Sequence, residues 1–235
     1  MQTDAPYLRR SPVPGEWAEH GGAWPSLDAA YVAVCDALNG PVAAWKLGGT
    51  NEATRQAFNV STLYFGPLYT DEVFAADQPM ELPLLQTQAE VEIAIRIGVN
   101  GFDAWCFAAE LPSCPLRNVA ASGVATLVAD RCGAGALILG PVRRLAEGWS
   151  GDITLNIGGA AVARGHADRL IADPIAIAAQ FVGLARRYGF APKQGDWIAT
   201  GGLTPCVPIP RTGAVTVAVD GRPEFTFSMA AEDRC

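Results

Sequence analysis

The chain has 235 residues, of which 50% are hydrophobic and 17% are charged, and its formal net charge is −7. This acidic charge, with no cluster of Lys and Arg to offset it, disfavours binding to nucleic acid or to an acidic membrane surface. No uninterrupted apolar run is long enough to cross a bilayer, so we expect neither a membrane span nor a membrane partner.

The first 25 residues hold four prolines and three glycines. They predict an irregular arm over residues 1–25, followed by a single domain over residues 26–235. The arm carries Glu19 and His20, a pair that could act as a general base; a solvated loop histidine is the alternative. The arm lacks the apolar segment of a signal peptide, and the six cysteines form no C-x-x-C pair. We therefore expect a cytoplasmic protein with reduced thiols.

From Ser26 the spacing of apolar residues predicts a helix over residues 27–38, which Ser26 caps and Asn39-Gly40 ends. The next run, residues 41–49, reads as an apolar strand with a single lysine, Lys46. A lysine within a buried strand is unusual. Its stem could carry the charge to the surface from an edge strand, or its ammonium could be a fixed cation for a substrate carboxylate or a proton-transfer group. Asn51 then starts a short helix.

Residues 88–112 carry the clearest strand pattern, because apolar and other residues alternate with a period of two. One face receives Val91, Ile93, Ile95 and Ile97, and the opposite face receives Glu90, Glu92, Ala94 and Arg96. A second apolar strand, over residues 104–110, ends on Glu110.

Three carboxylates that converge at the ends of two neighbouring strands would raise one another's pKa sharply. A divalent cation is the usual remedy, and ligation by oxygen alone selects Mg²⁺, Mn²⁺ or Ca²⁺ over zinc. The alternative is an ordinary solvated face, since that face also alternates with a period of two.

The second half of the chain is richer in strands. Residues 116–131 read as a helical segment that Gly123 weakens, and residues 152–165 as a hairpin around Gly158-Gly159. Asp173 caps the best helix of the chain, which has Pro174 at its first position. Further strands follow, and the segment 200–205 reads as a glycine-threonine turn. Such a turn can offer N–H groups and hydroxyls to an anion, although a plain turn is the commoner case.

Eight motifs in order carry a resemblance to a known family. WKLG, E-V-E within a strand, AAELP, VAD, LILGP, NIGGAAVARG, DPIAIAAQFVGLARRYG and GDWIATGGLTP resemble the fumarylacetoacetate hydrolase superfamily. They are more similar to its 2-keto-4-pentenoate hydratase branch, which includes the 4-oxalocrotonate decarboxylases. The resemblance covers roughly residues 27–228 and implies an α+β fold with a mixed β-roll core and a few flanking helices.

The resemblance also implies a site. It assigns Mg²⁺ or Mn²⁺ to Glu90, Glu92 and Glu110, and a catalytic and substrate-binding role to Lys46. The glycine-threonine turn would hold the substrate through Gly201, Gly202, Leu203 and Thr204. A 2-oxo or 2-enol acid could chelate the metal, which would stabilise the charge of the enolate.

The activity that the resemblance implies is that of a metal-dependent lyase. We expect a hydratase that adds water to a 2-hydroxy-2,4-dienoate or a related unsaturated 2-oxo acid through a metal-bound enolate, as in aromatic catabolism. The family also implies a homo-oligomer, and the apolar composition agrees with one.

The chain departs from the family pattern at three places. The interval between Glu92 and Glu110 is shorter than usual, and Gly202 replaces a serine. Where the family has A-D-N-A-S-S, this chain has A-D-R-C-G-A, which places Arg131 near the expected pocket. We expect Arg131 to be a second catalytic cation, suited to a second acidic group on the substrate.

Two other functions therefore remain open. The first is a decarboxylase or C–C bond hydrolase of a 2-oxo acid or diacid. The second is a non-catalytic or repurposed member of the family. The shortened interval and the altered residues around Arg131 favour this alternative. The retained glutamates and Lys46 speak against it, because buried charge is costly unless it is paired.

Overall fold

The computed structural model describes residues 12–13, 22–76, 80, 88–114, 116, 118–210 and 212–229. Glu19 and His20, and most of the predicted arm, lie outside the described residues. In the described part, no helix is long and apolar enough to cross a membrane.

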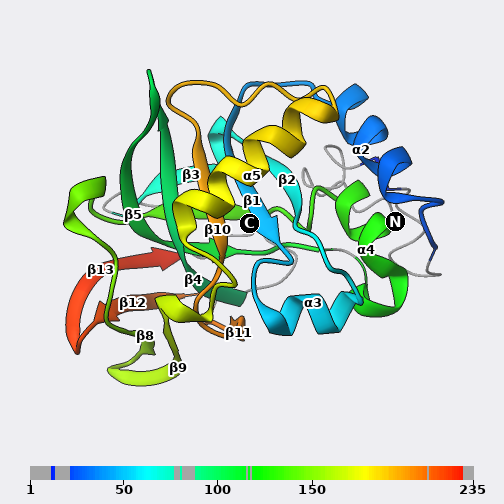
Figure 1. The fold of residues 1–235 in the computed structure, drawn as a ribbon. Helices are drawn as coiled ribbons and strands as arrows, with labels where there is room; N and C mark the ends of the chain where they lie inside the picture. The colour runs from blue at the N-terminus through cyan, green and yellow to red at the C-terminus, as the bar shows by residue number, and fades with distance from the viewer. Residues whose placement is uncertain are drawn as a thin grey trace.

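A nine-stranded sheet forms the centre of the fold, with the main order β2-β1-β10-β4-β5-β6-β3 (Figure 1). Its middle is the long antiparallel pair of β4 (Gln88–Gly98) and β5 (Gly101–Leu111). The sheet is mixed, because β1 runs parallel to β10 and β3 runs parallel to β6. The other strands are β1 (Val42–Gly48), β2 (Tyr64–Tyr69), β3 (Val73–Ala75), β6 (Ala136–Leu139) and β10 (Trp197–Gly202), with β7 (Arg143–Arg144) beside β5 and β11 (Val207–Pro208) beside β4.

A second sheet of four strands has the order β13-β12-β8-β9. It contains the predicted hairpin, formed by β8 (Asp152–Ile157) and β9 (Ala160–His166), together with β12 (Gly213–Val219) and β13 (Arg222–Met229). Gly158 and Gly159 both have a positive φ, which the tight turn of the hairpin requires.

In the described part of the chain four α-helices flank the sheets: α2 (Leu27–Asp36), α3 (Glu52–Phe58), α4 (Val119–Ala129) and α5 (Pro174–Arg187). The predicted caps are confirmed, since Ser26, Asn51 and Asp173 each accept a backbone N–H of the first turn. Gly123 breaks the helical geometry of α4 with a φ of 79°. Figure 1 shows α5 lying across the large sheet, with α2 and α4 together on another side. The predicted α+β class is confirmed.

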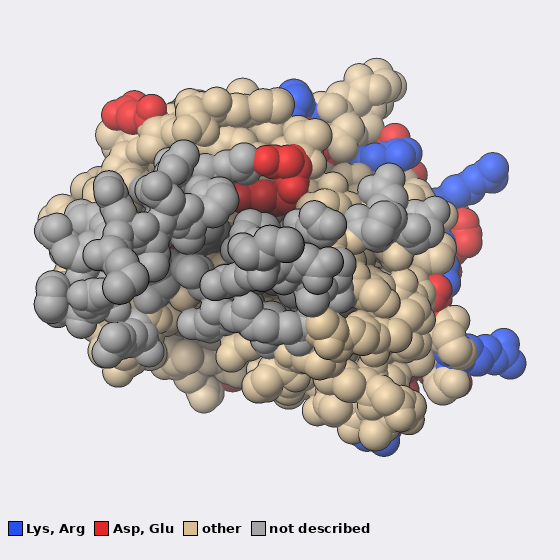
Figure 2. Space-filling model, turned by 180° about the vertical axis from the view of Figure 1, so that it is seen from behind, with Lys and Arg blue, Asp and Glu red and all other residues tan. Residues whose placement is uncertain are grey.

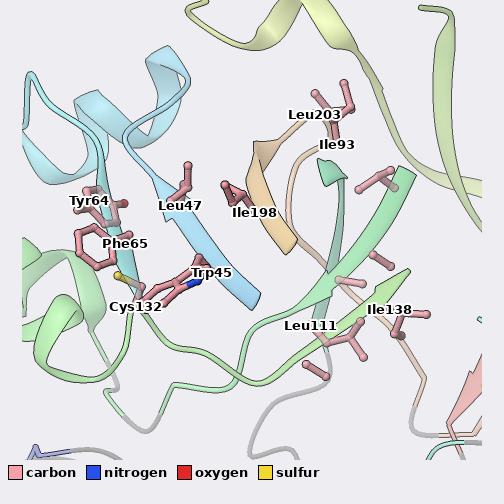
Figure 3. Packing of buried hydrophobic residues seen from close by; sticks show 14 of the residues in the cluster. Trp45, Leu47, Tyr64, Phe65, Ile93, Leu111, Cys132, Ile138, Ile198 and Leu203 are labelled. Carbon is pink, nitrogen blue, oxygen red and sulfur yellow. The ribbon is translucent and has the colours of Figure 1, made fainter. Parts of the chain in front are cut away.

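The two faces of the large sheet differ in kind. On one face an aromatic cluster packs under α5, where Phe181 lies 5.4 Å from the ring of Trp45 and 5.1 Å from that of Phe65. On the other face the central residues are mostly small, among them Ala44, Ala94, Ala108 and Ala199, and all of these are buried. Figure 3 shows Trp45 and Phe65 among the buried hydrophobic residues. The glutamates of β4 and β5 belong to the face of small residues.

Removing the aromatic anchor of α5 tests this packing. We expect Phe181→Ala to lower the free energy of unfolding by about 3–5 kcal/mol, because it leaves a cavity beneath the helix. Val32, which is exposed on α2, provides the control. Val32→Ala should change the free energy of unfolding by less than about 0.5 kcal/mol. Urea denaturation of both variants measures the difference. Equal stability of the two variants would contradict this account of the core.

Candidate metal centre and substrate pocket

The pairing of β4 with β5 brings the three predicted glutamates together. Glu90 lies directly opposite Glu110 in the ladder, and Glu92 lies opposite Ala108. Because side chains alternate between the faces of a strand, all three carboxylates project from the same face. One carboxylate oxygen from each glutamate lies within 4.8 Å of the others.

These carboxylates are not an ordinary solvated face. Glu92 is 0% exposed and Glu110 is 1% exposed, while Glu90 is half-buried at the edge of the cluster. Burial, followed by the charge of Glu110, raises the pKa of Glu90 to about 8. The same two causes raise the pKa of Glu92 well above its usual value. The cluster therefore holds protons at neutral pH when nothing else compensates its charge.

Lys46 is the positive charge closest to this cluster in the described structure. It lies on β1, which is flanked by β2 and β10, so the explanation from an edge strand is wrong. Only 7% of the residue is exposed, and its ammonium forms an ion pair with Glu110. Burial would lower the pKa of Lys46, but the charge of Glu110 and the hydrogen bond to it raise it above its usual value. Lys46 therefore stays protonated.

The donor set fits a hard divalent cation. All candidate ligand atoms are carboxylate oxygens, which suit Mg²⁺, Mn²⁺ and Ca²⁺. One oxygen of Glu92 accepts a hydrogen bond from the Gly201 N–H at 2.8 Å, whereas the other is buried without a partner. A buried carboxylate oxygen with no hydrogen bond is costly, and a cation bound among the three side chains would satisfy it.

The glycines after Thr200 make room for the cluster. Gly201 has a φ of +113°, which few other residues adopt, and a side chain there would also collide with Thr50. A Cβ at Gly202 would collide with the Glu90 carboxylate. The replacement of the family's serine by Gly202 is therefore linked to the position of Glu90 in this chain.

The predicted substrate-binding segment divides into two parts. Gly201 and Gly202 line the cavity described below. Leu203 is fully buried and donates its N–H to the Val91 carbonyl, and the Thr204 hydroxyl accepts the Val91 N–H at 3.0 Å. Neither lines that cavity, so for these two residues the expected contact with substrate is not supported. They hold the chain against β4.

A cavity of about 260 Å³ lies beside the glutamate cluster. Its lining includes Glu90 and Glu110, Lys46 and Gly48 of β1, and Tyr64 and Cys132. A larger groove, of about 660 Å³, runs along the four-stranded sheet, but none of the described residues that line it is titratable. The smaller cavity is therefore the candidate site of chemistry.

Arg131 does not take the predicted place in this cavity. Its guanidinium binds both oxygens of Glu72, at 2.8 and 3.0 Å, and lies 5.1 Å from the centre of the Tyr69 ring. Only 1% of Arg131 is exposed. The expected catalytic role is therefore not supported; this arginine has a structural ion pair.

The backbone explains why Arg131 turns away. Arg131, Cys132 and Gly133 all have positive φ values, 52°, 60° and 66°, which form a left-handed turn at the end of α4. Within this turn the Arg131 carbonyl packs against Gly66, where a Cβ would not fit. The turn directs the thiol of Cys132 to the cavity and the guanidinium of Arg131 to Glu72.

Replacing Arg131 tests this structural role. Arg131→Met leaves Glu72 buried without its ion pair, so we expect a loss of about 3–5 kcal/mol in the free energy of unfolding. The double variant Arg131→Met/Glu72→Gln should recover part of this loss. Chemical denaturation measures both. Unchanged stability of Arg131→Met, combined with lost affinity for a divalent metal, would contradict the structural role.

Sequence reasoning also missed residues of the cavity wall. Tyr64 fell within an apolar segment, and Cys132, although part of the A-D-R-C-G-A departure, was given no role. Asn51 was recognised only as a helix cap; its amide also donates a hydrogen bond to the Gly202 carbonyl at 3.2 Å. Arg169 does not line the cavity, but its charge acts on Glu90 and opposes the rise of its pKa.

Solved structures share this architecture. The 4-oxalocrotonate decarboxylase from Pseudomonas putida G7, complexed with magnesium and adipate, superposes with a TM-score of 0.79 and 18% identity over 95% of this chain and 93% of that chain. The chain has the fold of the fumarylacetoacetate hydrolase superfamily. Fumarylpyruvate hydrolase from Pseudomonas aeruginosa, in complex with Mn²⁺ and pyruvate, gives a TM-score of 0.57 at 16% identity over 82% of this chain and 91% of that chain.

A third structure with this fold is 5-carboxymethyl-2-hydroxymuconate delta-isomerase from Mycobacterium smegmatis. It gives a TM-score of 0.59 at 14% identity, over 83% of this chain and 80% of that chain. No protein-family model matches the sequence, and no curated protein sequence matches it either. At such low identities the likeness establishes the fold, which confirms the architecture that the sequence predicts.

The raised pKa values of Glu90 and Glu92 predict how metal binding depends on pH. Below about pH 8 the metal-free cluster retains protons, which a cation must displace, so affinity should rise between about pH 6 and pH 8.5. Binding should also release protons. Calorimetric titration with Mn²⁺ in buffers of different ionisation enthalpy measures this release. An affinity that stays constant over this range, with no proton release, would contradict the proposed pKa values.

Proposed function

We propose that this protein is a divalent-metal-dependent hydratase, a lyase that adds water to a 2-hydroxy-2,4-dienoate or a related unsaturated 2-oxo acid. The observation that carries the proposal is the buried cluster of Glu90, Glu92 and Glu110 beside a cavity of about 260 Å³. One oxygen of Glu92 is buried there without a hydrogen-bond partner, and the buried Lys46 forms an ion pair with Glu110.

Each residue has a distinct task in this proposal. The three glutamates would hold Mg²⁺ or Mn²⁺, which supplies positive charge for the enolate form of a 2-oxo acid. Lys46 fixes the Glu110 carboxylate through their ion pair and gives the cavity a positive charge that attracts the substrate carboxylate. The Gly201 N–H orients Glu92, and Gly202 leaves space for Glu90.

The similar structures support the same chemistry. One of them is complexed with magnesium and adipate, and another with Mn²⁺ and pyruvate, so proteins with this fold hold a divalent ion and an organic acid. Their activities are a decarboxylase and a hydrolase of oxo acids. Homo-oligomer formation and a cytoplasmic location remain predictions from the sequence.

The alternatives rank below hydration. A C–C bond hydrolase of this superfamily would use a His–Glu pair; the candidate pair Glu19–His20 lies outside the described residues, and His166 pairs with Asp168 at the end of β9 and does not line the cavity. A decarboxylase of an oxo-diacid is favoured by the overall likeness to the 4-oxalocrotonate decarboxylase. A repurposed scaffold would have little reason to retain three acidic side chains in a buried cluster.

Metal titration of the stripped protein tests the proposal. We expect wild type to bind one Mg²⁺ or Mn²⁺ per chain, and Glu92→Gln to lose binding while it remains folded. The metal-free form of Glu92→Gln should be at least as stable as wild type at about pH 8, because the amide cannot ionise, whereas burial makes the ionised Glu92 carboxylate unfavourable. Glu52→Gln, a change in an exposed glutamate of α3, is the control and should bind the metal like wild type.

Turnover is measured with the same three proteins. The metal-loaded wild type and Glu52→Gln should hydrate 2-hydroxypenta-2,4-dienoate, seen as loss of the dienol absorbance, and Glu92→Gln should not. If wild type binds the metal but converts neither this acid nor an oxo-diacid, the proposed metal centre stands and the proposed lyase activity is wrong. If wild type does not bind the metal, both the proposed metal centre and the proposed lyase activity are wrong.

A further inference from the structure

The hydroxyl of Tyr64 is a polar group on the cavity wall that the proposed chemistry does not yet use. Tyr64 is only 4% exposed and lines the cavity. Its hydroxyl makes no hydrogen bond with any described residue. Tyr31, a buried tyrosine of the adjoining core, differs, because its hydroxyl accepts the Phe65 N–H at 3.1 Å. This oxygen is not sealed from solvent but open to the cavity, so its O–H is free to donate a hydrogen bond to a ligand there.

Two neighbours fix the Tyr64 ring in place. Tyr64 is paired with Gly48 across β1 and β2, and its ring and hydroxyl occupy the space that a Cβ on Gly48 would need. Phe58 packs edge-on at 5.9 Å between ring centres. Gly48 and Lys46 lie on the same face of β1, so the phenol extends across the face that carries the metal centre.

The charges of the site act on this phenol. Lys46, Glu90 and Glu110 all influence the pKa of Tyr64, which burial raises above its usual value. Tyr64 therefore remains a neutral donor across the physiological range. Phe58, Leu127 and Cys132 also line the cavity and carry no charge, and the polar residues Thr50, Asn51 and Thr54 beside them are uncharged as well. Figure 3 shows Tyr64 and Cys132 beside β1.

Charge balance gives a second, independent argument. Three glutamates and one lysine, loaded with a divalent ion, make a site with no net charge, which accepts a monoanion more readily than a dianion. Among the described residues that line the cavity, Lys46 is the only Lys or Arg, and Glu110 already pairs with it. Arg131 binds Glu72, and Arg169 acts from the side of Glu90.

We infer that Tyr64 recognises an uncharged oxygen at the far end of the substrate, and that the substrate is a monocarboxylic 2-oxo acid rather than a diacid. This inference rests on the proposed hydratase. In that reaction the oxygen of water bonds to C4 of the unsaturated 2-oxo acid and a proton goes to C3, so the product carries a 4-hydroxyl. With the carboxylate and 2-oxygen at the metal end, Tyr64 would donate its hydrogen bond to that 4-oxygen.

Binding of three acids to the Mn²⁺-loaded protein, followed by calorimetry, tests the inference. The acids are 2-oxopentanoate, 4-hydroxy-2-oxopentanoate and 2-oxoglutarate, which differ at the far end. We expect wild type to bind the 4-hydroxy acid about tenfold more tightly than 2-oxopentanoate, the contribution of one hydrogen bond, and 2-oxoglutarate most weakly. Tyr64→Phe should lose the tenfold preference but bind 2-oxopentanoate and Mn²⁺ like wild type.

Stability provides a readout that does not depend on activity. Because the Tyr64 hydroxyl is open to the cavity and makes no hydrogen bond with a described residue, Tyr64→Phe should keep a melting temperature close to that of wild type in the absence of ligand. Tyr188→Phe is the matched control, since it removes a phenol that binds Asp28 at the surface and should keep the preference for the 4-hydroxy acid.

The outcomes separate the two proposals. If Tyr64→Phe keeps the preference while wild type binds the acids, the role of Tyr64 is overturned and the hydratase stands. If wild type prefers 2-oxoglutarate, the monoacid is overturned in favour of a diacid. If loaded wild type binds none of the three acids, the proposed function falls and this inference falls with it.

Discussion

The repulsion among three buried carboxylates is the constraint that the rest of the site depends on. Glu90, Glu92 and Glu110 share one face of the β4–β5 pair, and two of them have almost no contact with solvent. One ammonium, that of Lys46, cannot balance three negative charges, so the metal-free cluster retains protons. A divalent ion bound among these buried carboxylates is therefore stabilised electrostatically far more than it would be at the surface.

Strand register determines the position of each member of this cluster. The antiparallel pairing places Glu90 opposite Glu110, and β10 brings the Gly201 N–H to Glu92 from the neighbouring strand. Lys46 reaches Glu110 from β1, on the other side of β10. The aromatic core under α5 lies on the opposite face and keeps these strands in place. On the face seen in Figure 2, the Lys and Arg side chains are separate groups, most of them along the right-hand edge of the view. They do not join into a continuous basic surface among the residues drawn in colour there.

Local patterns in the sequence were enough to predict most elements, whereas the choice of a metal cluster over a solvated face depended on the family resemblance. Alternation showed the faces of β4, and the apolar strand after it placed Glu110 near Glu90. Arg131 could not be placed in this way, because its direction depends on three consecutive left-handed residues and on Glu72, which is distant in sequence. Thr204 has a residue type suited to anion binding, but its partner is the Val91 N–H. Only the pairing of β1 with β2 shows that Tyr64 lies over Gly48.

Buried oxygens without a hydrogen-bond partner help to distinguish a working site from a repurposed scaffold. Glu92 and Thr50 each have a buried oxygen without a hydrogen-bond partner, whereas the Tyr64 hydroxyl is open to the cavity. Thr50 and Tyr64 line the same cavity, and Glu92 adjoins it through the Gly201 N–H. Each of the two buried oxygens destabilises the metal-free protein by about 1–3 kcal/mol. A scaffold without a ligand would gain stability by losing them, so their position beside the cavity favours a site that a metal ion and an organic acid complete.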